Sequence, residues 1–142
     1  MPEKLLHRIE IAAPPERVWD ALTTRDGIAG WWTTDCDVPK GAGSVAVFGF
    51  YERATVFRMR IDESVRPKRL AWACVGDFYE WIGTRVEWDL VPTDGGTDVR
   101  LAHLGWRSAG GCFASCNTTW GELLYRLAAY AEGKSPGPLF AD

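Results

Sequence analysis

His103 is the side chain in this sequence that is best suited to chemistry. Alternation along residues 97–103 predicts a half-buried strand, in which His103 shares a face with Val99 and Leu101. A neutral imidazole on an apolar face can act as a general base or as a polar anchor, because burial disfavours its charged form. The alternative is a structural histidine whose ring is hydrogen-bonded by a side chain of the last helix, such as Asn117.

Cys112 and Cys116 are four positions apart, so they would lie on one face of a helix. Together with His103 they could bind a soft metal, because thiolate and imidazole are zinc ligands. A closed zinc site has four ligands, and the sequence offers no second close pair of Cys or His. We therefore expect no metal, no cofactor and no disulfide, and we interpret both cysteines as small apolar side chains that pack in and before the helix.

Other catalytic patterns are missing from the sequence. It has neither a G-x-S-x-G nucleophile elbow nor an H-E-x-x-H metal motif. Glu87 and Asp89 fall at outward positions of a predicted strand, where carboxylates are ordinarily solvated. Glu80, which precedes Trp81, is the one acid whose environment could differ. No acid–base pair is predicted from spacing alone.

Alternating patterns predict an antiparallel sheet in the middle of the chain. Besides residues 97–103, the predicted strands are 45–51, 57–62, 70–74 and 84–90. The turn at residues 92–97 joins the last two strands. If Leu90 faces Val99 across that hairpin, then Trp88 faces Leu101 and Val86 faces His103.

Helices are predicted before and after these strands in the sequence. Near the N-terminus a strand leads to Pro14-Pro15, a helix that carries Trp19, and a second short helix that ends at Trp31-Trp32. The C-terminal helix has an apolar stripe formed by Cys116, Trp120, Leu123, Leu124, Leu127 and Ala131. It could begin at Ser115 or at Thr119, and Gly133 is suited to end it. Gly121, inside the helix, indicates either a close approach of another element or a weak helix start.

Composition limits the classes of function. The chain has 142 residues and a formal net charge of −3, which predicts a single domain over residues 1–142 with no general attraction to nucleic acid or anionic lipid. No apolar run approaches the roughly 20 residues that span a bilayer. The N-terminal residues are too charged for a signal peptide, so we expect a cytoplasmic protein with reduced cysteines.

Several segments carry a family resemblance that covers nearly the whole chain. They are Pro14-Pro15-Glu16-Arg17-Val18-Trp19-Asp20-Ala21-Leu22, Gly30-Trp31-Trp32, Pro67-Lys68-Arg69-Leu70 with Trp72, Gly95-Gly96-Thr97 before Val99-Arg100-Leu101-Ala102-His103, Trp120-Gly121-Glu122-Leu123-Leu124, and Tyr130-Ala131-Glu132-Gly133. In order and spacing, the chain resembles the START-like, birch-pollen-allergen-like (SRPBCC) helix-grip superfamily. Within it, the chain is most similar to the branch named after the activator of the heat-shock-protein ATPase.

The resemblance implies an α+β fold in which a curved antiparallel sheet of about six or seven strands grips the C-terminal helix. It also implies a cavity between sheet and helix, which we expect to bind a small hydrophobic or planar molecule. The residues expected to line this cavity are Trp31, Trp32, Phe57, Met59, Trp72, Trp81, Trp88, Leu101, His103, Asn117, Trp120 and Leu124.

Two other functions remain open at this point. The same cavity could serve a cyclase, dehydratase or hydrolase-like enzyme with His103 as the base. The chain could instead be a co-chaperone-like interaction module that contacts a chaperone. The cavity could also be filled by its own aromatic side chains.

Overall fold

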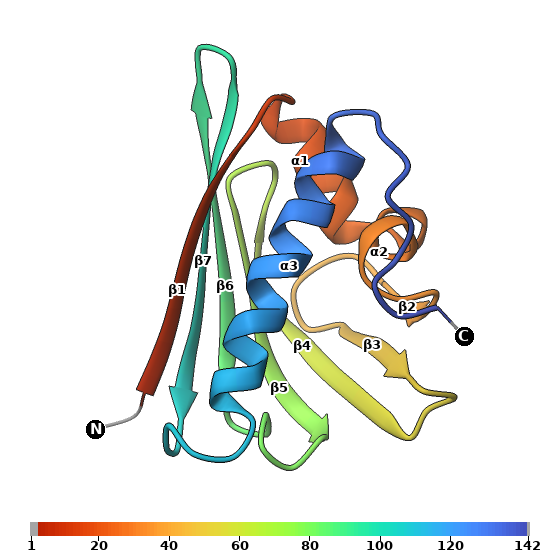
Figure 1. Cartoon of the computed structure of the whole chain (residues 1–142), viewed down its shortest axis with the longest axis vertical. Helices are drawn as coiled ribbons and strands as arrows, with labels where there is room; N and C mark the ends of the chain where they lie inside the picture. The colour runs from red at the N-terminus through yellow and green to blue at the C-terminus, as the bar shows by residue number, and fades with distance from the viewer. Residues whose placement is uncertain (1–2, 142) are drawn as a thin grey trace.

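A seven-stranded antiparallel sheet and three helices make up the computed structural model, which describes residues 3–141. In chain order the elements are β1 (Glu3–Ile11), α1 (Pro15–Thr23), α2 (Arg25–Trp31), β2 (Asp35–Asp37), β3 (Val45–Phe50), β4 (Thr55–Val65), β5 (Arg69–Asp77), β6 (Arg85–Thr93), β7 (Gly96–Trp106) and α3 (Phe113–Ala131). The strand order is β1-β7-β6-β5-β4-β3-β2. Figure 1 shows α3 lying across one face of the curved sheet, with α1 and α2 beside its C-terminal half. The predicted α+β helix-grip fold is confirmed.

The β6–β7 hairpin has the register that alternation predicts. Leu90 pairs with Val99, Trp88 with Leu101, and Val86 with His103, and all six of these residues are buried. Because side chains alternate across a strand, this register turns one continuous face of the hairpin toward α3.

Helices α1 and α2 pack closely because Gly27 brings their backbones together. A Cβ atom at Gly27 would lie 2.6 Å from the Cα atom of Ala21. The Thr24 hydroxyl caps α2 by accepting a hydrogen bond from the Gly27 amide at 3.0 Å. At the end of α2, the buried Trp31 indole donates to the Ala21 carbonyl at 2.9 Å. These contacts fix the two tryptophans at the end of α2.

Helix α3 begins at Phe113, earlier than either predicted start. The hydroxyls of Ser115 and Thr119 do not cap it but donate to backbone carbonyls one turn back, those of Cys112 and Ser115. The cap comes from a distant loop instead, where the Glu80 carboxylate accepts a hydrogen bond from the Cys112 amide at 3.2 Å. A carboxylate is favourable there, because the first turn has unpaired amides and carries the positive end of the helix dipole.

The C-terminal segment is tied to the end of α2. The amide of Phe140 donates to the Trp32 carbonyl at 2.9 Å, and the amide of Leu139 donates to the Trp31 carbonyl at 3.3 Å. Neither this attachment nor the short strand β2 is predicted by the sequence pattern. Among residues 3–141, no helix combines the length and the apolar character that crossing a membrane requires.

Replacing Gly121 by Ala should stabilise the protein by about 0.5–1 kcal/mol, because Gly is that much less favourable than Ala inside a helix. A Cβ atom at Gly121 would meet no heavy atom within 4 Å, so the close approach considered from the sequence is wrong. Urea unfolding measures the change.

The matched control is Gly27→Ala, also within a helix. Its new methyl group would collide with the α1 backbone, so this variant should be less stable than the wild type. A loss of stability in Gly121→Ala would contradict the assignment of open space beside that residue.

Candidate functional site

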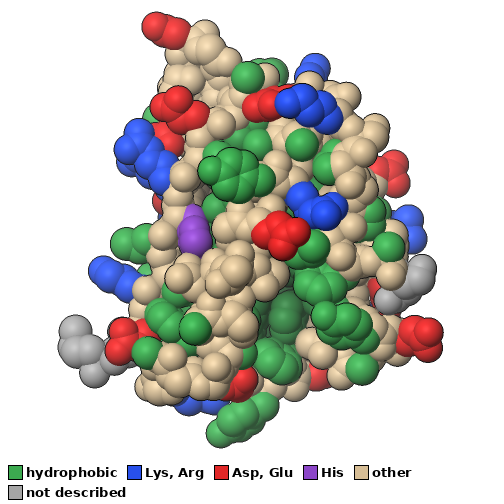
Figure 2. All heavy atoms as spheres, viewed as in Figure 1, with side chains coloured by type: hydrophobic (Ala, Val, Ile, Leu, Met, Phe, Trp, Pro, Cys, Tyr) green, Lys and Arg blue, Asp and Glu red, His purple; other side chains and the backbone are tan. Residues whose placement is uncertain are grey.

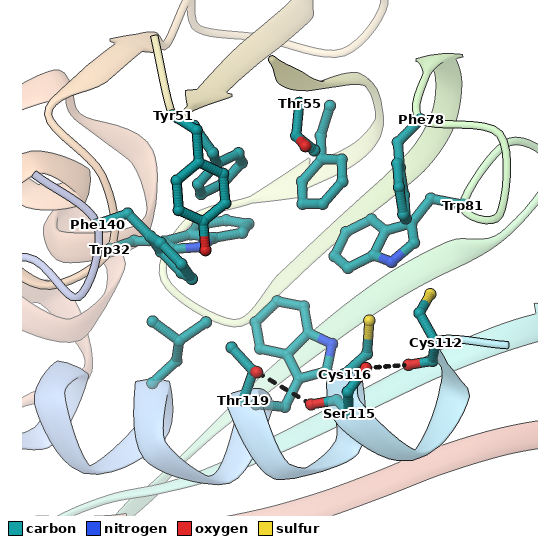
Figure 3. Close-up of a pocket in the computed structure, with 14 residues that line it drawn as sticks. Trp32, Tyr51, Thr55, Phe78, Trp81, Cys112, Ser115, Cys116, Thr119 and Phe140 are labelled. Atoms are coloured by element: carbon teal, nitrogen blue, oxygen red, sulfur yellow. Dashed lines mark hydrogen bonds between the residues drawn. The ribbon is translucent and has the colours of Figure 1, made fainter. Parts of the chain in front are cut away.

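A cavity of about 320 Å³ lies between the first turns of α3 and the strands β3 and β4. Figure 2 shows hydrophobic side chains gathered around a hollow beside the lower half of α3. Figure 3 shows the residues around it: Trp32, Phe50, Tyr51, Thr55, Phe57, Phe78, Trp81, Cys112, Ser115, Cys116, Thr119, Trp120, Leu123 and Phe140.

Stacked aromatic rings form the inner walls of the cavity. Trp81 stacks on Phe57 with ring centroids 3.9 Å apart, and it lies nearly parallel to Trp120 at 6.0 Å. Trp120 in turn lies 5.5 Å from Trp32. Since Trp32, Trp81 and Trp120 are almost fully buried, these walls are held by the core of the protein. Such flat faces favour a planar guest.

The rim of the cavity is formed by residues that are distant in sequence. The Phe140 ring lies edge-on to Phe50 at 5.0 Å and to Tyr51 at 5.7 Å. Tyr51 begins a turn in which three successive residues have positive φ, and the Arg53 guanidinium fixes this turn through a two-pronged ion pair with Asp35. The tied C-terminal segment and this turn therefore shape one side of the opening.

The polar groups of the cavity carry no formal charge. Ser115 and Thr119 use their hydroxyl protons on helix carbonyls, which leaves oxygen lone pairs as acceptors. All the lining residues are aromatic, aliphatic, hydroxyl or thiol side chains. The cavity therefore suits an uncharged molecule, because a charged one would lose its hydration without gaining an ionic partner.

His103 is buried in the interior, beside this cavity but outside its lining. The Trp120 indole donates a hydrogen bond to Nδ1 of His103 at 3.1 Å. Because an indole nitrogen can only donate, Nδ1 must accept, and the ring proton is on Nε2. Nε2 donates to the Thr84 hydroxyl at 2.9 Å, and that hydroxyl donates to the Trp81 carbonyl at 2.6 Å.

This network gives His103 a structural role. Burial lowers the pKa of His103 to about 3, so the ring is neutral at physiological pH. Both ring nitrogens are occupied, which leaves no free lone pair to accept a proton from a substrate. The partner on the last helix is Trp120 rather than Asn117, which is exposed.

The cavity includes some of the residues expected from the sequence and leaves out others. Four of the expected residues line it: Trp32, Phe57, Trp81 and Trp120. Six more pack in the core outside it: Trp31, Met59, Trp72, Trp88, Leu101 and Leu124. Trp31, Trp72 and Trp88 fill the interior between the sheet and the middle of α3, and the cavity lies beside the first turns of that helix.

Sequence reasoning missed much of the cavity wall. The missed residues are Phe50, Tyr51, Thr55, Phe78, Ser115, Thr119, Leu123 and Phe140. Cys112 and Cys116 also line the cavity, whereas only a packing role was expected for them. The spacing of Cys112 with Cys116 and of Ser115 with Thr119 could have indicated a face of small side chains, since residues four apart are neighbours on a helix.

Charged residues gather instead on the outer face of the sheet. Arg69 bridges Glu63, Glu87 and Asp89, while Arg85 bridges Glu63 and Glu87. Partial burial opposes ionisation of Glu87, but hydrogen bonds from the two arginines lower its pKa below the ordinary value. Within residues 3–141, no three His, Cys, Asp or Glu side chains form a group that could hold a metal ion.

Comparison with known proteins identifies similar sequences and folds. The model of the family "Activator of Hsp90 ATPase homolog 1-like protein" matches residues 12–132. The Aha1 dimer from Colwellia psychrerythraea is 31% identical with a TM-score of 0.85, over 92% of this chain and 97% of that one. Protein CV1439 from Chromobacterium violaceum is 23% identical with a TM-score of 0.80, over 94% and 100% of the two chains. Protein MLL2253 from Mesorhizobium loti is 21% identical with a TM-score of 0.77, over 89% and 94%. No curated protein gives a significant match.

Lowering the pH from 7 to 5 should destabilise the wild-type protein by about 1–2 kcal/mol more than the His103→Gln variant. The pKa of His103 is about 3 in the folded state and near 6.5 in an unfolded chain. Between these values only the unfolded state gains the proton. The contribution of His103 is therefore complete above about pH 6.5 and is lost as the pH falls toward 3.

Urea unfolding of both proteins at the two pH values measures this difference. The Gln amide can accept from Trp120 and donate to Thr84, so the variant keeps the hydrogen bonds without the titration. His7 is present in both proteins, so any contribution it makes to the pH dependence cancels in the comparison. Equal losses in the two proteins would rule out the buried neutral state of His103.

Proposed function

Because the chain belongs to the family of Activator of Hsp90 ATPase homolog 1-like proteins, we propose that it binds a small, uncharged, planar molecule in the cavity beside α3. The observation that carries the proposal is the cavity itself, whose lining is aromatic and free of formal charge. A volume of about 320 Å³ falls at the lower end of the range of small-molecule sites.

Binding would be driven by removing apolar surface of the guest from water, at roughly 25 cal/mol per Å². The walls require little rearrangement, because Trp81 and Trp120 are already fixed by ring stacking and by the His103 network. Preformed walls lower the cost of ordering on binding. The acceptor oxygens of Ser115 and Thr119 would orient a guest that carries a hydrogen-bond donor.

A catalytic role for His103 receives no support from these contacts, because both of its ring nitrogens are engaged inside the core. A second candidate function, contact with a chaperone ATPase, is favoured by the family match. Its test is the ATP hydrolysis rate of a purified 90-kDa heat-shock chaperone with and without this chain. Stimulation would support that function, and an unchanged rate would count against it.

The binding proposal predicts that N-phenyl-1-naphthylamine, an uncharged dye that fluoresces in apolar sites, binds the protein saturably. Thr119→Phe should weaken its binding at least tenfold, about 1.4 kcal/mol, because the new ring would occupy the cavity that Thr119 lines. Fluorescence titration measures both affinities.

Thr118→Phe is the matched control. Thr118 is the neighbouring residue on α3 but is exposed and outside the cavity lining, so this variant should bind the dye like the wild type. Urea unfolding checks that both variants are folded. No saturable signal with the wild type, or equal affinity in Thr119→Phe, would refute the proposed site.

A further inference from the structure

The two cysteines at the start of α3 form a dithiol inside the candidate cavity. Cys112 is the N-cap residue and Cys116 lies one turn later, with its amide bonded to the Cys112 carbonyl at 2.8 Å. Residues so spaced have Cβ atoms about 5–6 Å apart on one helix face. Both side chains line the cavity, and Figure 3 shows both sulfur atoms on its side of α3.

The environment of the pair keeps Cys112 as a neutral thiol. Burial raises its pKa, and interactions with the Glu80 carboxylate and the Cys116 thiol raise it further. A neutral thiol is a poor ligand for a metal cation, which requires thiolates. Within residues 3–141, the pair also belongs to no group of three His, Cys, Asp or Glu side chains that could hold a metal ion, whereas a closed zinc site has four ligands. The two thiols are therefore better suited to a compound that reacts with both of them and forms an uncharged adduct than to a metal cation.

A buried hydrogen-bond donor faces the same two sulfur atoms. The indole nitrogen of Trp81 has no hydrogen-bond partner, although the residue is only 3% exposed. Figure 3 shows this nitrogen on the edge of the ring that is turned toward Cys112 and Cys116. Leaving a buried donor unpaired is unfavourable, so an acceptor brought to this place would gain a hydrogen bond at little further cost.

We propose that Cys112 and Cys116 are a binding site for a trivalent arsenical that carries one organic substituent. In the reaction R–As(OH)₂ + 2 Cys–SH → R–As(S–Cys)₂ + 2 H₂O, two As–O bonds and two S–H bonds break. Two As–S bonds form, the protons leave in water, and no atom is oxidised or reduced. The arsenic binds one carbon and two sulfurs, so two thiols suffice and the adduct carries no charge.

The aromatic cavity would hold the organic substituent of this adduct. The ring walls formed by Trp81 and Trp120 stand beside the cysteines, so a phenyl group bound to the arsenic would enter apolar space. The uncharged adduct agrees with a lining that has no formal charge. This part of the inference rests on the proposed function, because it uses the same cavity, whereas the As–S bonds depend only on the dithiol.

Phenylarsine oxide is the probe for this site, and it is added to the reduced protein in a large excess of glutathione. Glutathione removes arsenic from single cysteines but competes poorly with a protein dithiol that chelates it. Native mass spectrometry should show one phenylarsine group per chain, and 2,3-dimercaptopropanol should remove it. The Cys112→Ser and Cys116→Ser variants should each bind at least tenfold more weakly.

Cys36→Ser and Cys74→Ser are the matched controls, because both residues are buried and neither lines the cavity. They should bind like the wild type. Binding that survives in Cys112→Ser or Cys116→Ser, or a wild-type protein that binds no arsenical under these conditions, would overturn the dithiol site.

A competition experiment separates this inference from the proposed function. Phenylarsine oxide should displace N-phenyl-1-naphthylamine from the wild type. If the arsenical binds while the dye does not, the dithiol site stands and the proposed function fails. If both bind without competing, the placement of the substituent in the cavity is wrong.

Discussion

The hydrogen bond from the Trp120 indole to His103 is the contact on which the arrangement of the site depends. It joins the middle of α3 to β7, and the chain of bonds continues through the Thr84 hydroxyl to the backbone of Trp81. One neutral histidine thus fixes the helix and the loop that carry two walls of the cavity. Each such bond contributes about 1 kcal/mol, but an unpaired member buried here would cost about 1–3 kcal/mol. The network therefore favours one placement of the rings.

The position of the cavity follows from the sizes of the side chains along α3. In the first turns of the helix, the residues that face the cavity are small: Cys112, Ser115, Cys116 and Thr119. Later turns carry Trp120 and then leucines, which meet the tryptophans of α2 and of β5 and β6 and fill the interior. Because each tryptophan side chain buries roughly 150–250 Å² of surface, a few of them fill the space between the sheet and the middle of α3. The cavity of about 320 Å³ lies where these small side chains face the sheet.

The sequence carried enough information for the fold and for the register of its central hairpin. Alternation along β6 and β7 is a local signal, so the pairing of Trp88 with Leu101 could be predicted from it. The N-terminus of α3 could not be predicted in this way. Its cap is the Glu80 carboxylate, which accepts a hydrogen bond from an amide 32 residues away in the sequence. For the same reason Phe140 and Tyr51 were missed, since they reach the cavity through tertiary contacts.

The expected role of His103 shows where reasoning from strand faces reaches its limit. Alternation indicates which way a side chain points, and His103 does lie in the interior. Alternation does not indicate whether neighbouring groups already satisfy that side chain. Here Trp120 and Thr84 occupy both ring nitrogens, and burial holds the pKa far below neutrality.

The charges and the uncharged polar groups of this protein are separated in space. Arginines such as Arg69 and Arg85 form ion pairs on the outer face of the sheet, where each surface pair contributes little to stability. The cavity holds hydroxyls, thiols and ring edges instead. A guest would then be selected by its flatness, its volume and the placement of a few hydrogen-bonding groups, because the cavity lining has no charged side chain that could attract it. Discrimination between similar guests must accordingly come from the rigid ring walls that the His103 network holds in place.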